Sequence, residues 1–298
     1  MLKRPAFLKK NDQVAVVAPA KKFPAEQLEA GLSRLESWGL KVVPGKNLYK
    51  EHHQFAGTDK ERLSDLQKAF DNKNIRAVFC VRGGYGSNRF VDHIDLKQFR
   101  QSPKWLTGYS DITMLHGLLQ REGFQSIHGT MPLLFGKDSY DSLESLRKTL
   151  FGERIEYTVE SDPLNRRGKA EGILIGGNLS ILQTMIGTPT DFDSRKKILF
   201  IEEIDEYLYQ LDRMMIHLKR AGKLKSLAGL VVGHMSDMKD NDSPFGKNVR
   251  EIILESVKEY KFPVCFNFPA GHETENMALR LGAKMSLNVG REKSFLSF

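Results

Sequence analysis

Cysteine is scarce in this chain, and its scarcity excludes several classes of protein. Cys80 and Cys265 each lie inside an apolar run typical of a strand. We interpret both as small core residues, and expect neither a disulfide framework nor a cysteine-ligated metal. No stretch approaches the roughly 20 apolar residues of a membrane-spanning helix, and the first residues lack the continuous apolar region of a secretory signal. We therefore expect a cytoplasmic protein with no membrane partner.

Clustered positive charge is also missing, although the formal net charge is +8. Lysine and arginine alternate with acidic residues along the helical stretches, and no pattern of aromatic and basic residues marks a surface on which bases could stack. We expect a solvated basic surface with a mild preference for anionic ligands, and no nucleic-acid partner. At 298 residues and 40% hydrophobic content, the chain is long enough for one large domain or two ordinary ones.

Strands and helices alternate through the first half of the chain. An apolar run at 12–20, an amphipathic stretch at 26–39 and a β-branched run at 40–45 predict a strand, a helix and a strand. A further buried strand at 75–81 leads directly into a glycine-rich turn. This alternation predicts an α/β fold with a mainly parallel sheet covered on both faces.

The pattern changes between about 150 and 170, where a polar alternating strand is followed by a turn rich in Pro, Asn, Arg and Gly. We expect a first domain at 1–155, a linker at 156–170 and a second domain at 171–298. The second half has short apolar strands and fewer helices, which is typical of a smaller, partly antiparallel domain.

Ser110 lies in the most informative local motif, Gly108-Tyr109-Ser110-Asp111-Ile112-Thr113, at a predicted strand-to-helix turn. A serine at this position is presented beside free backbone N–H groups, which can stabilise negative charge on an attacked carbonyl. Ser110 or Asp111 could instead be only an N-cap of the helix, as these residue types usually are, and the hexapeptide alone favours the cap. The motif also differs from the hydrolase pattern G-x-S-x-G, because Ile112 replaces the second glycine.

The turn Arg82-Gly83-Gly84-Tyr85-Gly86 follows another predicted strand, where ligand-binding loops gather in open α/β sheets. Its glycines could bring backbone N–H groups close to a substrate. A tight turn explains them equally well. A dinucleotide site is disfavoured, because the spacing G-x-G-x-x-G is absent.

An acidic strand end and one histidine complete the candidate chemistry. The strand at 197–203 ends in Glu202 and Glu203, and a carboxylate there could orient a histidine. Such a cluster is also typical of a solvated loop. His272 follows a strand and a Pro-Ala-Gly turn, where an imidazole can be directed at a substrate.

Several short motifs occur in a fixed order along nearly the whole chain. They are Arg82-Gly83-Gly84-Tyr85-Gly86, GYSDIT at 108–113, His128-Gly129 before Met131, Gly176-Gly177-Asn178-Leu179, ILFIEE at 198–203 with LDRM at 211–214, and Ala270-Gly271-His272. Together they resemble the LD-carboxypeptidase family, which includes muropeptide-recycling carboxypeptidases and microcin C immunity peptidases. Two positions depart from the family pattern: Thr130 replaces a more frequent proline, and Arg280 replaces an apolar residue.

The resemblance implies a serine peptidase with a catalytic triad of Ser110, Glu202 and His272. Glu202 is preferred over Glu203 because the family's acid is the first of the pair. The backbone N–H groups of Gly84 and Asp111 would form the oxyanion hole. The implied fold is an N-terminal domain similar to class I glutamine amidotransferases and a smaller, swivelling β/α domain, with the site between them.

The implied activity is hydrolysis of the L,D-peptide bond that releases terminal D-alanine from murein tetrapeptides during peptidoglycan recycling. Arg82 and Tyr85 are expected to contact this small peptide substrate, and Arg82 is by its position one candidate for the cation that binds the free carboxylate beyond the cut. We expect no metal or organic cofactor, and the family suggests a homodimer. Two alternatives stay open: a microcin C immunity-like peptidase that cleaves peptidyl or aminoacyl nucleotides, and a non-catalytic muropeptide-binding protein.

Overall fold

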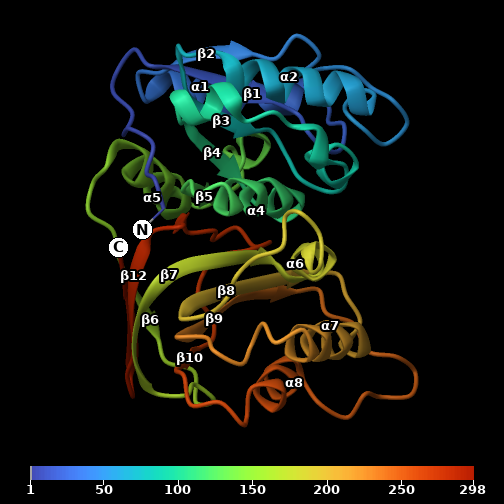
Figure 1. Ribbon diagram of the computed structural model, residues 1–298, viewed down its shortest axis with the longest axis vertical. Helices are drawn as coiled ribbons and strands as arrows, with labels where there is room; N and C mark the ends of the chain where they lie inside the picture. Colours follow the sequence, from blue (N-terminus) through green and yellow to red (C-terminus); the bar gives the residue numbers. More distant parts are fainter. Residues whose placement is uncertain (1) are drawn as a thin grey trace.

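The computed structural model describes residues 2–298, which form two β-sheets placed one above the other along the long axis of the molecule (Figure 1). The first half, blue to green in Figure 1, contains β1 (Gln13–Val17), α1 (Glu29–Ser37), β2 (Lys41–Pro44), α2 (Asp59–Asp71), β3 (Ile75–Cys80), α3 (Lys97–Gln101), β4 (Trp105–Gly108), α4 (Thr113–Arg121), β5 (Ser126–His128) and α5 (Tyr140–Phe151). The second half contains β6 (Glu156–Glu160), β7 (Gly168–Asn178), α6 (Leu179–Met185), β8 (Lys197–Ile204), α7 (Leu208–Arg220), β9 (Gly229–Ser236), α8 (Val249–Ser256), β10 (Val264–Cys265), β11 (Leu279–Leu281), β12 (Lys284–Val289) and β13 (Lys293–Ser297).

The first sheet has the strand order β11-β5-β4-β3-β1-β2. β1 to β5 run parallel, and β11 pairs antiparallel with β5 although it comes from the far end of the chain. Alternate residues of β1 face opposite layers: Val14 packs in the cluster that contains Leu35 of α1, and Ala15 packs in the one that contains Leu66 of α2. The predicted parallel sheet with both faces covered is therefore confirmed.

The second sheet has the order β10-β9-β8-β7-β12-β13-β6. β7 to β10 are parallel, and β12, β13 and β6 are antiparallel to their neighbours, so the predicted mixed character is confirmed. The expected linker at 156–170 contains the edge strand β6 and the start of β7. As domain bounds, the three ranges stay a prediction. No helix within residues 2–298 is long and apolar enough to cross a membrane.

The two halves share a continuous apolar core beside α4, which lies between the sheets in Figure 1. At the point of closest approach, the backbone N–H of Asn178 donates to Thr113 Oγ1 at 3.0 Å. A Cβ on Gly177 would lie 2.4 Å from that same Oγ1, so only glycine permits the contact. This packing explains the Gly-Gly-Asn motif at the end of β7 and places the start of α4 against the second sheet.

The two cysteines are buried and free, as predicted. Burial raises the pKa of the Cys265 thiol to about 11, which leaves it protonated and unreactive at neutral pH.

Candidate active site

Ser110 lies in the turn between β4 and α4, in a backbone conformation that serine rarely adopts. Its φ is +63°, within the left-handed region that favours glycine. A short 3-10 helix, Ser110–Ile112, follows and leads into α4. Non-glycine residues held at such angles cost on the order of 1–3 kcal/mol and cluster at functional sites. The surrounding structure therefore holds this serine in a conformation that its own preference would not select.

The alternative in which Ser110 or Asp111 caps the helix is wrong. The caps of the 3-10 helix and of α4 are Tyr109 and Ile112, and neither makes a side-chain capping hydrogen bond. Ile112 is fully buried and packs against Gly108, where a Cβ would lie 2.9 Å from its Cγ1. The turn from β4 through Ser110 to α4 thus forms without the second glycine of the hydrolase pattern, because the buried Ile112 packs against Gly108 instead.

Glu202 and His272 form a hydrogen-bonded pair at the end of β8. His272 Nδ1 lies 2.7 Å from Glu202 Oε2. Burial lowers the pKa of His272, but the charge and hydrogen bond of Glu202 outweigh it, so the pKa lies above its usual value. With Nδ1 engaged, Nε2 is the ring nitrogen left to exchange a proton with a substrate or a nucleophile.

Glu203 faces the opposite side of β8, because successive side chains of a strand alternate. Its carboxylate accepts hydrogen bonds from the backbone N–H of Ser180 at 2.7 Å and from Asn178 Nδ2 at 2.9 Å, at the start of α6. Desolvation by burial raises its pKa. Glu203 therefore secures a helix terminus, and Glu202 is the acid that meets the histidine.

Tyr109 connects the turn of Ser110 with His272. Its ring centroid lies 4.8 Å from that of His272 and 5.7 Å from that of His128, with edge-to-face or tilted geometry. His128 in turn contacts Phe200 of β8 at 4.9 Å. An aromatic cluster, Tyr109, His128, Phe200 and His272, thus joins the first sheet to the second directly beside Ser110.

The glycine-rich turn lies against Ser110. A Cβ on Gly83 would be 2.8 Å from Ser110 Cβ and 3.0 Å from its Oγ, so only glycine allows this approach. The turn is held by the carboxylate of Asp111, which accepts the backbone N–H groups of Gly86 at 3.2 Å and Ser87 at 2.9 Å. Gly84 lies outside the helices and strands, and its backbone N–H donates to no backbone carbonyl within residues 2–298.

Arg82 and Tyr85 lie at the mouth of this turn. Arg82 Nη1 donates to the carbonyl oxygen of Lys22 at 3.0 Å. Burial raises the pKa of Tyr109, and the charge of Arg82 opposes this increase in part. Tyr85 is 41% exposed and its ring lies 6.0 Å from that of Phe55. Both side chains are accessible to a substrate, and their predicted role in binding one stays a prediction.

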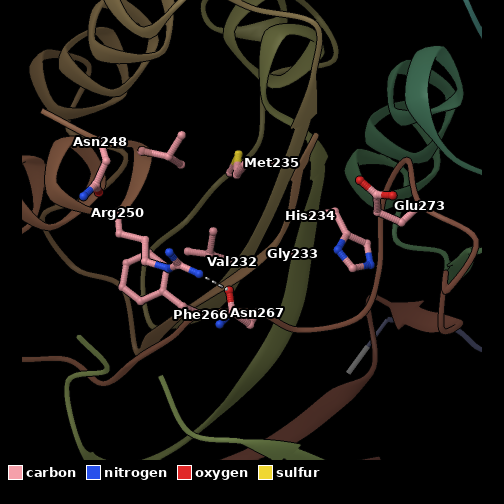
Figure 2. A pocket seen from close by; sticks show the side chains of 10 residues that line it. Val232, Gly233, His234, Met235, Asn248, Arg250, Phe266, Asn267 and Glu273 are labelled. Atoms are coloured by element: carbon pink, nitrogen blue, oxygen red, sulfur yellow. Dashed lines mark hydrogen bonds between the residues drawn. The ribbon is translucent and has the colours of Figure 1, made fainter. Parts of the chain in front are cut away.

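A pocket of about 560 Å³ opens near the carboxyl ends of β9 and β10, within the usual size range of ligand pockets (Figure 2). His234 and Glu273 lie at one end, while Arg250, hydrogen bonded to Asn267 at 3.0 Å, lies at the other. A Cβ on Gly271 would lie 3.1 Å from Cβ of both His234 and Glu202, so one glycine separates the pocket from the buried acid. Arg250 and Glu273 give the pocket charges of both signs, and neither Ser110 nor His272 is among the residues that line it.

Comparison with known proteins identifies the family. The model of the LD-carboxypeptidase N-terminal domain matches residues 14–129, and that of the LD-carboxypeptidase C-terminal domain matches residues 171–287. The chain belongs to the LD-carboxypeptidase family. The resemblance predicted from the ordered motifs is therefore confirmed.

Relatives in this family match nearly the full length of the chain. A probable murein peptide carboxypeptidase of Bacillus subtilis (strain 168) is 36% identical, over 98% of this chain and 94% of that protein. The crystal structure of a muramoyltetrapeptide carboxypeptidase from Oxalobacter formigenes has a TM-score of 0.87 at 30% identity, covering 96% of this chain and 98% of that one. A microcin C7 self-immunity protein has a TM-score of 0.86 at 22% identity over 100% and 98% of the two chains, a likeness of fold alone.

Three features of this LD-carboxypeptidase site escaped the sequence analysis. The side chain of Asp111, considered before only as a helix cap, fixes the glycine-rich turn. Tyr109 and His128 belong to motifs that were noticed, but nothing local indicated that their rings meet His272 and Phe200. Contacts of this kind become visible only once the two sheets are placed together.

The two departures from the LD-carboxypeptidase pattern have separate surroundings. Thr130 is fully buried and its hydroxyl donates to the carboxylate of Asp138, whose pKa burial raises to about 6. Arg280 lies on β11 opposite Ile127, with its guanidinium over the ring of Phe298 at 5.5 Å.

Proposed function

We propose that this LD-carboxypeptidase is a serine peptidase that hydrolyses the L,D-peptide bond preceding the terminal D-alanine of murein tetrapeptides. The observation that supports it most is the Glu202–His272 hydrogen bond, with the ring of His272 packed on Tyr109, the residue before a serine held at positive φ. A nucleophile, a base and a group that orients the base are the minimum for acyl transfer by a serine enzyme. The names of the relatives in Bacillus subtilis and Oxalobacter formigenes agree with this substrate class.

The proposed reaction has two steps. His272 Nε2 removes the hydroxyl proton while Ser110 Oγ attacks the scissile carbonyl carbon, and the same proton then passes to the leaving amine of D-alanine as the C–N bond breaks. Water, deprotonated by His272, next attacks the acyl ester and releases Ser110. Glu202 holds the imidazole and stabilises its protonated form.

The oxyanion of each tetrahedral intermediate would be bound by the backbone N–H groups of Gly84 and Asp111. Asp111 occupies the first turn of a helix, where N–H groups have no intrahelical acceptor. Gly84 has a φ of +112°, which a residue with a side chain rarely adopts. Fixed donors of this kind lower the barrier because they need no reorganisation as charge develops.

The surroundings of the reaction are part of the same proposal. We propose that the enzyme acts in the cytoplasm, as a homodimer, in the recycling of cell-wall peptides. Arg82 and Tyr85 would contact the peptide near the cut bond. No step in the proposed mechanism requires a metal or an organic cofactor.

The decisive experiment is mass-spectrometric detection of D-alanine released from murein tetrapeptides, in diaminopimelate and lysine forms. Wild type is expected to release D-alanine and Ser110→Ala to release none. Release by both proteins would contradict the role of Ser110. Release by neither would overturn the proposed reaction and lead to aminoacyl nucleotides as the next substrates to test.

A further inference from the structure

We infer that Lys21 binds the terminal carboxylate of the peptide substrate. The inference rests on the proposed function, because a carboxypeptidase acts on a chain whose last residue carries a free carboxylate. Burying that anion at the site without a cation would be costly. The structure offers Lys21, which the sequence analysis did not consider, in the loop that follows β1.

Lys21 lies directly over the glycine-rich turn. A Cβ on Gly84 would be 2.6 Å from Cδ and 2.8 Å from Cγ of Lys21, so the aliphatic stem of the lysine covers this glycine. The preceding residue, Gly83, meets Ser110 Oγ in the same way, at 3.0 Å. Two consecutive glycines therefore contact the proposed nucleophile and the lysine stem, and their Cα atoms are about 3.8 Å apart.

This spacing matches the chemistry of the substrate. In a peptide that loses its last residue, the attacked carbonyl carbon and the terminal carboxylate carbon are one residue apart, roughly 3–4 Å by standard bond lengths. When the carbonyl lies at Ser110 with its oxygen near the N–H of Gly84, the carboxylate lies within reach of a cation beside Gly84. The stem of Lys21 extends beyond this glycine by two further bonds to its ammonium group.

The ammonium of Lys21 has no protein partner within residues 2–298, whereas its neighbours do. Lys22 Nζ pairs with Glu51 Oε2 at 2.6 Å. Arg82 already donates to the carbonyl of Lys22. Lys21 is half-buried, and a half-buried cation without a counter-charge gains from an anionic ligand through charge-assisted hydrogen bonds.

The backbone that carries Lys21 is fixed, while its side chain is free. Lys21 forms a bridge with Phe55, and the N–H of Ala56 donates to Ala20 at 3.0 Å. The buried guanidinium of Arg62 donates to the carbonyl of Pro19 at 2.6 Å. This loop lies at the carboxyl edge of the first sheet, where the turn of Ser110 also lies, so the cation is positioned before substrate arrives.

The test compares two peptides and four proteins. The peptides are a murein tetrapeptide ending in D-alanine and the same peptide ending in D-alaninamide, which lacks the terminal charge. The proteins are the full-length wild type, Lys21→Met, Lys21→Arg and, as a matched control, Lys22→Met. Product release is followed by mass spectrometry to obtain kcat and KM, and thermal unfolding checks that each protein is folded.

Wild type is expected to prefer the acid, and Lys21→Met to raise its KM for the acid by about 10–100-fold with kcat nearly unchanged. The same variant should leave the amide unaffected. Lys21→Arg should restore part of the preference, and Lys22→Met should behave as wild type.

Three results would overturn the inference. If Lys21→Met prefers the acid as strongly as wild type does, Lys21 does not bind the terminal carboxylate. D-alanine release would still support the proposed function in that case. An equal loss of kcat for acid and amide would place Lys21 at the oxyanion instead. Failure of wild type to release anything from either peptide would overturn the proposed function, and the role of Lys21 with it.

Discussion

His272 Nδ1 lies 2.7 Å from Glu202 Oε2, and the two side chains differ sharply in exposure: that of Glu202 is 0% exposed and that of His272 is 14% exposed. The carboxylate is thus shielded from solvent and acts on the imidazole at short range, while the imidazole keeps a small exposed surface. Glu202 Oε1 has no hydrogen-bond partner within residues 2–298. The acid is therefore positioned by burial and by this one contact.

Glu202→Gln should lower kcat/KM by about 10²–10⁴-fold, because the imidazolium loses its counter-charge. It should also move the pH profile. In wild type, activity rises as pH increases through the raised pKa of His272, since the base must be neutral. In the variant the Glu202 charge is gone, while burial and the smaller opposing effects of Glu203 and Glu273 remain, so the rising limb should shift to lower pH. A limb that stays in place would contradict control of His272 by Glu202.

Glu203→Gln is the matched variant one residue away. It weakens the hydrogen bonds that the carboxylate accepts from Asn178 and Ser180 at the start of α6. The free energy of unfolding should fall by about 1–2 kcal/mol, as for the loss of a helix cap. The acidic limb of the pH–rate profile should shift to lower pH by less than in Glu202→Gln, because the charge of Glu203 is a smaller cause of the raised pKa of His272 than Glu202 is. A shift as large as that of Glu202→Gln would contradict the assignment of Glu202 as the main partner of His272.

Gly83→Ala should abolish most of the activity with little loss of stability. The added methyl would lie 2.8 Å from Ser110 Cβ, so it would displace the serine or the turn that faces it. A displacement of about 1 Å can cost 10²-fold in rate. Gly136→Ala is the control, because its Cβ would meet Ala30 Cβ at an ordinary 3.4 Å. Full activity in Gly83→Ala would contradict close contact between the turn and the serine.

His128→Phe should make the protein less sensitive to acid. His128 is fully buried with no hydrogen bond to either ring nitrogen within residues 2–298, and burial lowers its pKa well below the usual value. Below about pH 6.5, His128 therefore takes up a proton in the unfolded chain but stays neutral in the folded protein. This difference lowers the free energy of unfolding by about 1.4 kcal/mol per pH unit. Between pH 6.5 and 5, the variant should lose about 2 kcal/mol less than wild type in urea unfolding. Equal losses would contradict a neutral buried His128.

Much of the fold could be predicted from the sequence, because the strands that form the two sheets are apolar runs bounded by turns. The site was harder to predict. Ser110 and Asp111 have the composition of a helix cap, and only the φ of Ser110 and the side-chain contacts of Asp111 exclude that alternative. Local propensity carries no information on such contacts, because they come from another strand end.

The choice between Glu202 and Glu203 illustrates the same limit. Strand alternation predicts that the two carboxylates face opposite sides of β8, but not which side holds the histidine. The family resemblance indicated Glu202, and the contacts of both residues agree. Lys21 gave no signal in the sequence, because its importance depends on a glycine more than sixty positions away that packs under its stem.

The pairing of His272 with Glu202, both far along the chain from Ser110, has a consequence for biosynthesis. During translation, Ser110 and its turn emerge and can fold while the residues of β8 and the His272 segment are still to be made. On the proposed roles, the serine in such a nascent chain has no base. Hydrolytic power would arise only after the His272 segment has been made and has packed against Glu202, so a chain that lacks this segment would be harmless to the peptides around it.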